Sequence, residues 1–464
     1  MQKIDRGETL KVKFTSYTHD GLGIAKVNGY NRFNEELTNF PIFVEGALVG
    51  EEGIIELDEV RRSFGKGHIK KLFLDKASSD RVMPKCDIYD KCGGCHLQHM
   101  LYNAQLEFKK QRVIDAYKRI GGFDNVNVLD TLTSNEQFHY RNKVQIPFGY
   151  KSNKTISGFY ERETHRIIPI TSCYLQSDEA TEVIKFIKNL CNEFKIKGYD
   201  EETRQGDIKH VLIKESSINH ELMVILITKQ KEIRYLDNLV TKLKNRFSQI
   251  TSIIQNINPK ETNVILGEDD IVLFGNDYII DKIGEKTFKI GVKSFFQINS
   301  YTTNLLYQKA IEMAQFKPTD TIIDSYSGIG SIGITIGSNV KKIYQVEIVK
   351  EAVEFSKENA KLNNITNIES YCEDTLVQLK KWKEENKQID AIIVDPPRKG
   401  IDIELMNIIS EMNIKKVLYI SCDVTTQARD VKYLVSKGYT FGDVQPVDMF
   451  PNTLHVETIV TLVK

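Results

Sequence analysis

The sequence lacks the features that would place a protein in or across a membrane. Its 464 residues contain no apolar run near the roughly 18 residues that a membrane helix needs. The first ten residues, MQKIDRGETL, are polar and have no apolar core of the kind found in secretory signal peptides. We therefore expect a cytoplasmic protein with no membrane partner.

The chain also lacks net charge and an even number of cysteines. Its 63 basic residues balance 63 acidic ones, so any nucleic-acid-binding face must come from local clustering. Seven cysteines without a signal peptide argue against a framework of disulfides. Three of them, Cys86, Cys92 and Cys95, are so close in sequence that they indicate metal or cluster ligation instead.

No fixed-period repeat or low-complexity segment is present, and the changing pattern of elements predicts several domains. Residues 1–74 contain short strands separated by turns, which is typical of a small β-barrel. The stretch 60–71 is basic and includes Phe64, as in barrels that hold single-stranded nucleic acid, but a solvated surface strand explains it more simply. Residues 75–290 are predicted to be α+β, opening with the cysteines and a basic helix at 101–120.

From residue 291 to 464 short apolar strands alternate with helices, the pattern of a doubly wound α/β sheet. An antiparallel hairpin is expected to close the edge of this sheet. Parallel strands are expected at Thr321–Asp324, Lys342–Glu347, Ala391–Asp395 and Val417–Cys422, and the hairpin at Phe441–Val447 and Leu454–Val463.

The segment from Thr321 to Gly333 predicts a site for a nucleotide-like cofactor. A strand is followed by Gly328, Gly330 and Gly333, which match G-x-G-x-x-G and let the backbone approach a ligand. Glu347 ends the next strand, where a carboxylate can hydrogen-bond both ribose hydroxyls. These features fit NAD and S-adenosylmethionine about equally.

Three further features favour S-adenosylmethionine. Asp324 ends the strand before the glycines, where a carboxylate can face a cationic amino-acid tail. Asp395 begins the rigid loop Asp395-Pro-Pro-Arg398 at another strand end, and the two prolines behind it and the cofactor strand before it favour a role beside the reacting centre over simple turn capping. The edge hairpin is common in methyltransferase sheets, and ligands of such sheets lie outside the carboxyl ends of the strands.

Cys422 and Glu457 together predict covalent catalysis on a pyrimidine ring. Cys422 ends an apolar strand on the rim expected for the cofactor, and a nearby arginine, Arg429, favours the nucleophilic thiolate. A cysteine in such a strand is otherwise commonly a small hydrophobe. Glu457 is flanked by apolar residues, and burial would make it a better base, whereas an outward-facing strand residue would have no such role. Thiolate addition at carbon 6 of uracil activates carbon 5 toward a methyl sulfonium.

On these residues, the chain resembles the RNA 5-methyluridine methyltransferase family over nearly its whole length. The resemblance implies an OB-like TRAM barrel, a central α+β domain and a Rossmann-like S-adenosylmethionine methyltransferase domain. Asp423-Val424 stands where the family usually has Asn-Pro. The motifs that carry the resemblance are Asp395-Pro-Pro-Arg-Lys-Gly400, Ser421-Cys422 followed by Ala428-Arg429-Asp430, and Phe450-Pro451 through His455-Val-Glu457.

The resemblance also implies roles for individual residues. Cys422 would be the nucleophile and Glu457 the proton acceptor. Contacts to S-adenosylmethionine are expected from Gln297, Tyr326, Glu347, Asp395, Ser331 and Asp374, beside Gly328, Gly330 and Asp324. A [4Fe–4S] cluster is expected on Cys86, Cys92, Cys95 and Cys173, whose spacing alone leaves zinc equally open.

The expected function is methylation of carbon 5 of a uridine in RNA by a monomeric enzyme. The target is expected to be 23S rRNA, because within the family the cysteine cluster accompanies rRNA enzymes, with a tRNA T-loop uridine as the alternative. Its base must be flipped out to be reached from the ring face. Two alternatives of other classes are a non-catalytic RNA-binding ribosome assembly factor and an NAD-dependent oxidoreductase.

Overall fold

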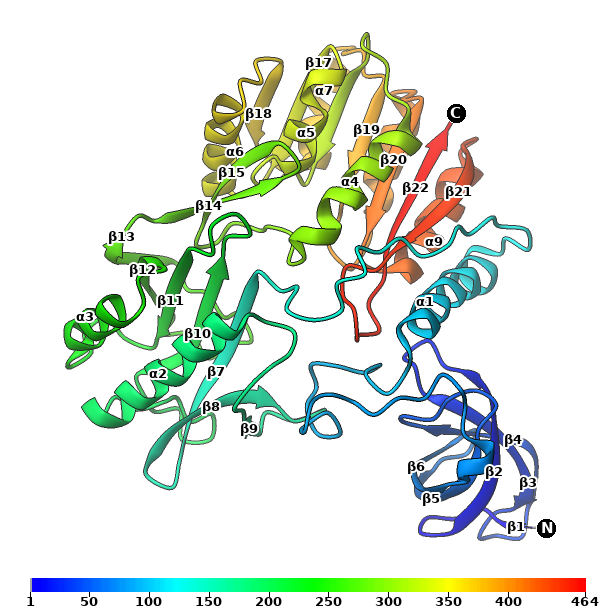
Figure 1. Ribbon diagram of the computed structural model, residues 1–464. Helices are drawn as coiled ribbons and strands as arrows, with labels where there is room; N and C mark the ends of the chain where they lie inside the picture. The colour runs from blue at the N-terminus through cyan, green and yellow to red at the C-terminus, as the bar shows by residue number, and fades with distance from the viewer. Residues whose placement is uncertain (1) are drawn as a thin grey trace. The chain divides into compact units, whose positions relative to one another are not determined.

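The computed structural model describes residues 2–464, which form two compact units. Unit 1 contains the chain up to Arg112 together with Asn452–Leu454. Unit 2 contains Val113–Pro451 and His455–Lys464. Figure 1 labels the helices and strands of both units.

Unit 1 begins with a closed β-barrel. Alternate side chains of its second strand point inward, where Leu10, Val12 and Phe14 are buried in the barrel core. The strand β3 (Gly23–Tyr30) pairs with both β2 (Thr9–Tyr17) and β4 (Glu36–Val44), and its pairing with β4 closes the sheet. This closure confirms the barrel expected from the sequence. The strands are β1 (Gln2–Lys3), β2 (Thr9–Tyr17), β3 (Gly23–Tyr30), β4 (Glu36–Val44), β5 (Glu52–Val60) and β6 (Gly65–Leu72).

The segment after the barrel is mostly irregular and leads into α1 (Tyr102–Ala116). Arg81 anchors this segment to the barrel: its Nη2 donates to the fully buried carboxylate of Glu51 at 2.6 Å and to the carbonyl of Gly46 at 2.7 Å. The helix expected at 101–120 is present as α1, and the turn that follows it, Tyr117–Gly121, is a π-helix.

Unit 2 contains an N-terminal sheet with the order β13-β12-β11-β10-β7-β8-β9. Helices α2 (Asp178–Phe194) and α3 (Leu236–Arg246) cover one face, where Val211 and Ile213 pack into their hydrophobic cluster. The strands are β7 (Lys143–Lys151), β8 (Lys154–Tyr160), β9 (Ile167–Pro169), β10 (Ile208–Glu215), β11 (Leu222–Thr228), β12 (Ile250–Ile257) and β13 (Asp269–Gly275). A separate ribbon, β14 (Tyr278–Ile283) with β15 (Lys286–Gly291), follows.

The C-terminal sheet of unit 2 is doubly wound, with the order β18-β17-β16-β19-β20-β22-β21 (Figure 1). Neighbouring residues of one strand enter opposite cores: Ile322 packs into one hydrophobic cluster and Ile323 into another. Both faces are therefore covered, as in other parallel sheets. The strands are β16 (Thr321–Ser325), β17 (Lys342–Glu347), β18 (Ile368–Cys372), β19 (Ala391–Val394), β20 (Lys416–Ser421), β21 (Thr440–Val447) and β22 (Glu457–Val463). The helices are α4 (Ser300–Ala314), α5 (Ser331–Ile336), α6 (Lys350–Leu362), α7 (Thr375–Glu384), α8 (Ile403–Glu411) and α9 (Val424–Ser436).

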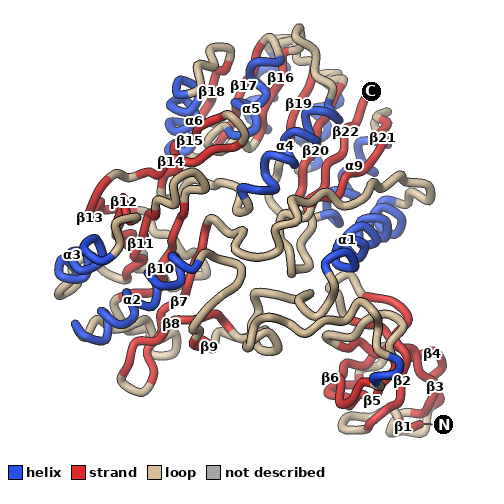
Figure 2. The backbone as a smooth tube through the Cα atoms, in the orientation of Figure 1, coloured by secondary structure: helices blue, strands red, loops and turns tan. Residues whose placement is uncertain are grey.

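The hairpin expected at the edge of this sheet is present, but its boundaries differ from the expectation. The strand β22 begins at Glu457 rather than at Leu454, and it lies between β20 and β21. The connection from β21 to β22 is a long loop, as the tan tube of Figure 2 shows. The strand β18 was not expected from the sequence.

Candidate active site

The expected catalytic residues meet at one edge of the doubly wound sheet. The strand β20 pairs with the antiparallel strand β22 so that Ser421 lies opposite Thr458. Cys422 directly follows β20 and Glu457 is the first residue of β22, so the strand register places them side by side. Asp395 follows β19, the other neighbour of β20, and so emerges at the same edge.

The thiol of Cys422 is half-buried and surrounded by carboxylates. Its pKa is raised to about 11, first by burial and then by the negative charges of Glu457 and Asp395. The guanidinium of Arg398 opposes this increase. Because this pKa lies well above neutral pH, the free site holds the sulfur mainly as the thiol. The thiolate, which is the nucleophilic form, is the minor species there.

The two carboxyl groups beside the thiol also titrate well above their usual range. Glu457 is 4% exposed, and its pKa is raised to about 8 by burial and by the charge of Asp395, with Arg398 opposing. Burial and the charge of Asp324 raise the pKa of Asp395 to about 7. A carboxylate with a pKa near the working pH is suited to accept a proton during catalysis.

Hydrogen bonds from buried polar groups stabilise the glycine turn after β16. Asp324 is 1% exposed, and its Oδ2 accepts hydrogen bonds from the Gly333 amide at 3.0 Å and from Gln345 Nε2 at 3.2 Å. Burial raises the pKa of Asp324 to about 6 in spite of these bonds. Gly330 has φ +83°, a conformation that glycine adopts without strain. The structure therefore gives Asp324 the task of holding the turn.

Glu347 occupies the position expected for a ribose-binding carboxylate at the end of β17. Its Oε2 accepts a hydrogen bond from the Gly328 amide at 3.0 Å, and its Oε1 accepts one from Val349 at 2.9 Å. These bonds orient the carboxylate toward the glycine turn and leave it lone pairs for further donors.

The remaining expected cofactor residues lie around the same turn. Tyr326 follows β16 with φ +57°, an uncommon conformation for a non-glycine residue and one that clusters at functional sites. Ser331 begins α5, and its hydroxyl is hydrogen-bonded to the hydroxyl of Tyr307 at 2.9 Å. Asp374 follows β18 and caps α7 by accepting a hydrogen bond from Val377 at 3.1 Å.

The segment that carries Gln297 is fixed by side chains from the other sheet of unit 2. Asn142 Nδ2 donates to the carbonyl of Gln297 at 2.8 Å. The buried ammonium of Lys214 donates to the carbonyls of Gly291 at 2.6 Å and Ser294 at 2.9 Å. Burial and the charge of Lys143 lower the pKa of Lys214 to about 7. Sequence reasoning missed both anchors, although a lysine in the apolar strand β10 was a signal.

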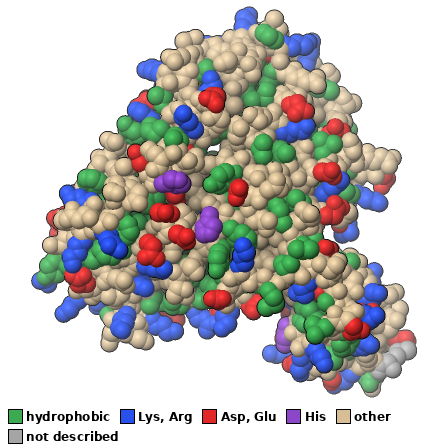
Figure 3. All heavy atoms as spheres, in the orientation of Figure 1, with side chains coloured by type: hydrophobic (Ala, Val, Ile, Leu, Met, Phe, Trp, Pro, Cys, Tyr) green, Lys and Arg blue, Asp and Glu red, His purple; other side chains and the backbone are tan. Residues whose placement is uncertain are grey.

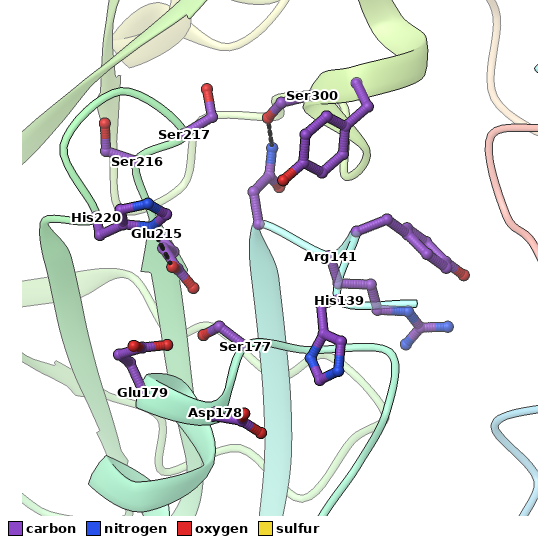
Figure 4. Close-up of a pocket in the computed structure, with 13 residues that line it drawn as sticks. His139, Arg141, Ser177, Asp178, Glu179, Glu215, Ser216, Ser217, His220 and Ser300 are labelled. Carbon is purple, nitrogen blue, oxygen red and sulfur yellow. Dashed lines mark hydrogen bonds and ion pairs between the residues drawn. The ribbon is translucent and has the colours of Figure 1, made fainter. Parts of the chain in front are cut away.

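A pocket of about 250 Å³ lies beside this segment (Figure 4). Arg141 lines it from the segment just before β7, and Ser300 lines it from the start of α4, where its hydroxyl accepts a hydrogen bond from Asn142. On the facing side, Glu215 at the end of β10 is paired with His220 at 3.1 Å. Most of the lining residues are polar, and the pocket adjoins the Gln297 segment.

The cysteines expected to bind a cluster are divided between the units, with Cys86, Cys92 and Cys95 in unit 1 and Cys173 in unit 2. Within residues 2–464, none of the four is in a disulfide. The Sγ of Cys95 accepts a hydrogen bond from Gln98 at 3.2 Å. Within residues 2–464, no three His, Cys, Asp or Glu side chains are grouped so that they could hold a metal ion. The residue types suit an iron–sulfur cluster, because cysteine thiolates are its usual ligands.

The surface shows no large field of one sign on the face drawn in Figure 3, where lysine, arginine and acidic side chains are interspersed. This mixture agrees with the zero net charge of the chain. Among the helices of residues 2–464, none combines the length and the hydropathy that crossing a membrane requires.

A doubly wound sheet with this edge hairpin, and with a glycine turn and acidic strand ends at one edge, has the fold of S-adenosylmethionine-dependent methyltransferases. The model of the tRNA (uracil-5-)-methyltransferase family matches residues 101–464, and that of the TRAM domain matches residues 4–70. The chain belongs to the tRNA (uracil-5-)-methyltransferase family and carries an N-terminal TRAM domain. It is an S-adenosylmethionine-dependent RNA (uracil-5-)-methyltransferase.

Relatives and solved structures agree with this assignment. An uncharacterized RNA methyltransferase of Bacillus cereus is 41% identical over 99% of this chain and 97% of its own length. One from Clostridium tetani is 40% identical over the same shares. The crystal structure of the Pyrococcus abyssi tRNA (uracil-54, C5)-methyltransferase in complex with S-adenosyl-L-homocysteine matches with a TM-score of 0.74 and 27% identity, covering 98% of this chain and 99% of the other.

Proposed function

We propose that this protein methylates carbon 5 of a uridine through a transient bond between Cys422 Sγ and carbon 6 of the uracil ring. The observation that carries the proposal is the pairing of β20 with β22, which sets a thiol beside a buried carboxyl group. The charge of Asp395 raises the pKa of both groups, and the charge of Arg398 lowers it. Neither a non-catalytic RNA-binding factor nor an NAD-dependent oxidoreductase requires this arrangement.

The proposed reaction moves one proton and one methyl group. The thiolate of Cys422 bonds to carbon 6, and the electrons of the 5,6 double bond pass into an enolate. Carbon 5 then takes the methyl group that S-adenosylmethionine supplies when bound. Glu457 accepts the carbon 5 proton, and cleavage of the sulfur–carbon bond restores the double bond and the thiolate.

The residues proposed to bind S-adenosylmethionine surround the glycine turn. Glu347 would bind the ribose hydroxyls, while Asp324 supports the turn beneath. Gly328 and Gly330 let the backbone approach the cofactor. The other proposed contacts are Gln297, Tyr326, Ser331, Asp374 and Asp395. Calorimetric titration of S-adenosyl-L-homocysteine into Glu347→Ala tests this set, and unchanged affinity would remove Glu347 from it.

Trapping tests the covalent step directly. In RNA containing 5-fluorouridine, carbon 5 holds fluorine where Glu457 must remove a proton, so the protein should remain covalently bound to the RNA. Cys422→Ala should form no adduct, whereas Cys372→Ala, at an exposed cysteine, should form it at the wild-type rate. A full adduct yield from Cys422→Ala would exclude Cys422 as the nucleophile.

We propose 23S rRNA as the substrate, because the cysteine pattern follows the rRNA members of the family. A tRNA T-loop uridine is the second candidate, and it is favoured by the tRNA substrate named for the Pyrococcus abyssi enzyme. Mass-spectrometric mapping of 5-methyluridine in rRNA and tRNA of a deletion strain separates the two. Loss of the modification from tRNA alone would overturn the rRNA proposal.

The cluster and the domain boundaries remain predictions. A [4Fe–4S] group on Cys86, Cys92, Cys95 and Cys173 predicts about four iron and four sulfide per chain after anaerobic purification. One zinc without sulfide would contradict it. The domains are proposed at 1–74, 75–290 and 291–464, in a monomer. Limited proteolysis and size-exclusion chromatography with light scattering test the boundaries and the monomer.

A further inference from the structure

A second cavity in unit 2, of about 470 Å³, shares no residue with the proposed methyl-transfer site. It lies where β10 begins and β12 ends, and the loop after β12 forms part of its lining. His210 lines it on the same face of β10 as Leu212, opposite the face covered by α2 and α3. The cavity is therefore set on the face of this sheet opposite α2 and α3.

The imidazole of His210 supplies a hydrogen-bond donor to this cavity. The residue is 8% exposed, and burial lowers its pKa to about 4, so the ring is neutral at physiological pH and carries one proton. Its Nδ1 is buried and has no hydrogen-bond partner in the described part of the chain. A proton on Nδ1 would be a buried donor without an acceptor, which is costly. The favoured tautomer therefore carries the proton on Nε2, the nitrogen that is not sealed off.

Two lysines lie against the ring of Tyr199, which lines the cavity, and one of them, Lys209, lines the cavity itself. The ammonium groups of Lys209 and Lys229 lie 4.9 Å and 5.7 Å from the centre of the Tyr199 ring. They donate to main-chain carbonyls, those of Lys260 at 2.7 Å and of Arg204 at 2.5 Å. Within residues 2–464, neither ammonium is in a salt bridge. Glu201 and Glu261 act on the charge of Lys209 without pairing with it, so the two ammonium groups against one ring remain open to an anion between them.

The rest of the lining is aromatic and acidic. Tyr160 and His165 make an edge-to-face contact with ring centres 5.5 Å apart, and such rings offer a surface to a flat base. Glu261 is paired with Arg204 at 2.6 Å, and Glu201 also lines the cavity. The negative charge of these carboxylates repels a phosphate from their side of the cavity. Their oxygens can accept a hydrogen bond from a base that presents an N–H group.

We propose that this cavity binds one unpaired nucleotide of the RNA substrate, away from the methylated uridine. The ring carbonyl of a uracil or guanine accepts a hydrogen bond from His210 Nε2. The adjoining phosphate lies at Lys209 and Lys229. The inference takes RNA as the substrate, as the family membership shows, and does not depend on the proposed Cys422 adduct.

Photo-cross-linking tests the location. The full-length protein is irradiated with a single-stranded 12-nucleotide RNA that contains 4-thiouridine, and the modified peptides are mapped by mass spectrometry. Cross-links are expected within 158–165, 199–210 or 258–265, besides those at the methyl-transfer site. They should persist in Cys422→Ala, which separates this site from the proposed covalent step. Cross-links confined to other segments would overturn the proposal.

Affinity and kinetics test the residues, with fluorescence anisotropy of the same RNA labelled with fluorescein. The double variant Lys209→Met/Lys229→Met should raise the dissociation constant about tenfold and reduce the slope of its logarithm against log salt by about 1. His210→Phe, which keeps the ring, should raise it about fivefold. Lys242→Met is the matched control, because Lys242 also lies over an aromatic ring, that of Phe194 at 5.1 Å.

Two outcomes would contradict the assignment. Variants that bind RNA like the control, while remaining folded by circular dichroism, would exclude the cavity as an RNA site. Uridine monophosphate that binds as tightly as the RNA, and loses affinity in the same variants, would identify a free nucleotide as the ligand instead. The expected kinetic pattern is a raised KM for RNA with an unchanged kcat and an unchanged affinity for S-adenosyl-L-homocysteine.

Discussion

Replacing Glu457 with glutamine should make the thiol of Cys422 more reactive while it stops methyl transfer. The charge of Glu457 is the largest cause of the raised thiol pKa after burial. Removing one adjacent like charge typically lowers a pKa by about 1 unit. The thiol pKa, about 11 in the wild type, should therefore fall while burial still holds it above its ordinary value.

The pH dependence of this effect distinguishes it from a general loosening of the site. Because the pKa of Glu457 is about 8, its carboxyl group is already neutral in the wild type well below that pH. Wild type and Glu457→Gln should then be alkylated at equal rates at pH 6.5. Above pH 9 the wild-type carboxylate is ionised and opposes the thiolate, so the variant should react about tenfold faster.

The assay is peptide-resolved mass spectrometry of iodoacetamide labelling between pH 6.5 and 9.5. The exposed Cys372 is the internal reference, and Glu411→Gln, which removes an exposed carboxylate paired with Lys383, is the control variant. A ratio of variant to wild-type rates that does not depend on pH would refute the electrostatic argument. In the same preparations, turnover should fall by about 10²-fold or more, as expected for loss of a general base.

Three further changes test other parts of the structure. Arg398→Met removes the cation that lowers the pKa of the thiol and of Glu457, so alkylation at pH 9 should slow several-fold, whereas Arg398→Lys should restore it. The pKa of Lys214 is lowered to about 7 in the folded protein, so the unfolded chain binds more protons between pH 7 and 10 and the wild type gains stability there. Lys214→Met should lose this gain, at most about 1.4 kcal/mol per pH unit, in urea unfolding at pH 7 and 9. Gly400→Ala should destabilise by about 1–3 kcal/mol in thermal unfolding, because φ is +78° and the added Cβ meets a carboxylate, whereas Gly442→Ala, with open space around it, should not.

The doubly wound sheet was predictable because its strands are short apolar runs that end in chemistry-bearing residues. The strand β18 escaped notice because its residues are half-buried or exposed at the outer edge of the sheet and form no apolar run. The start of β22 was misplaced for the opposite reason. Apolar residues of the preceding loop, such as Met449 and Val456, are 0% and 2% exposed. Their apolar character reflects burial without strand pairing, and a sequence pattern does not separate the two.

The candidate site was predictable as a set of strand ends, because parallel strands bring their carboxyl ends to one edge whatever lies between them in sequence. The anchors Lys214 and Asn142 were not predictable in this way. They act on the Gln297 segment from β10 and from the residue before β7, about 80 and 155 positions away in the chain. Contacts of this kind depend on how two sheets pack, and no local spacing encodes them.

The carboxylate next to the nucleophile shows how structure changes an inference from sequence. Asp423 adjoins Cys422 and would be expected to oppose the thiolate strongly. In the structure it caps α9, where its Oδ1 accepts hydrogen bonds from the amides of Thr425 at 2.9 Å and Thr426 at 3.1 Å. The positive end of the helix dipole offsets its charge, and Asp423 is the smallest of the charges acting on the thiol pKa. The groups that decide when the thiolate forms are therefore those brought in by neighbouring strands, Glu457 and Asp395, rather than the residue beside it in the chain.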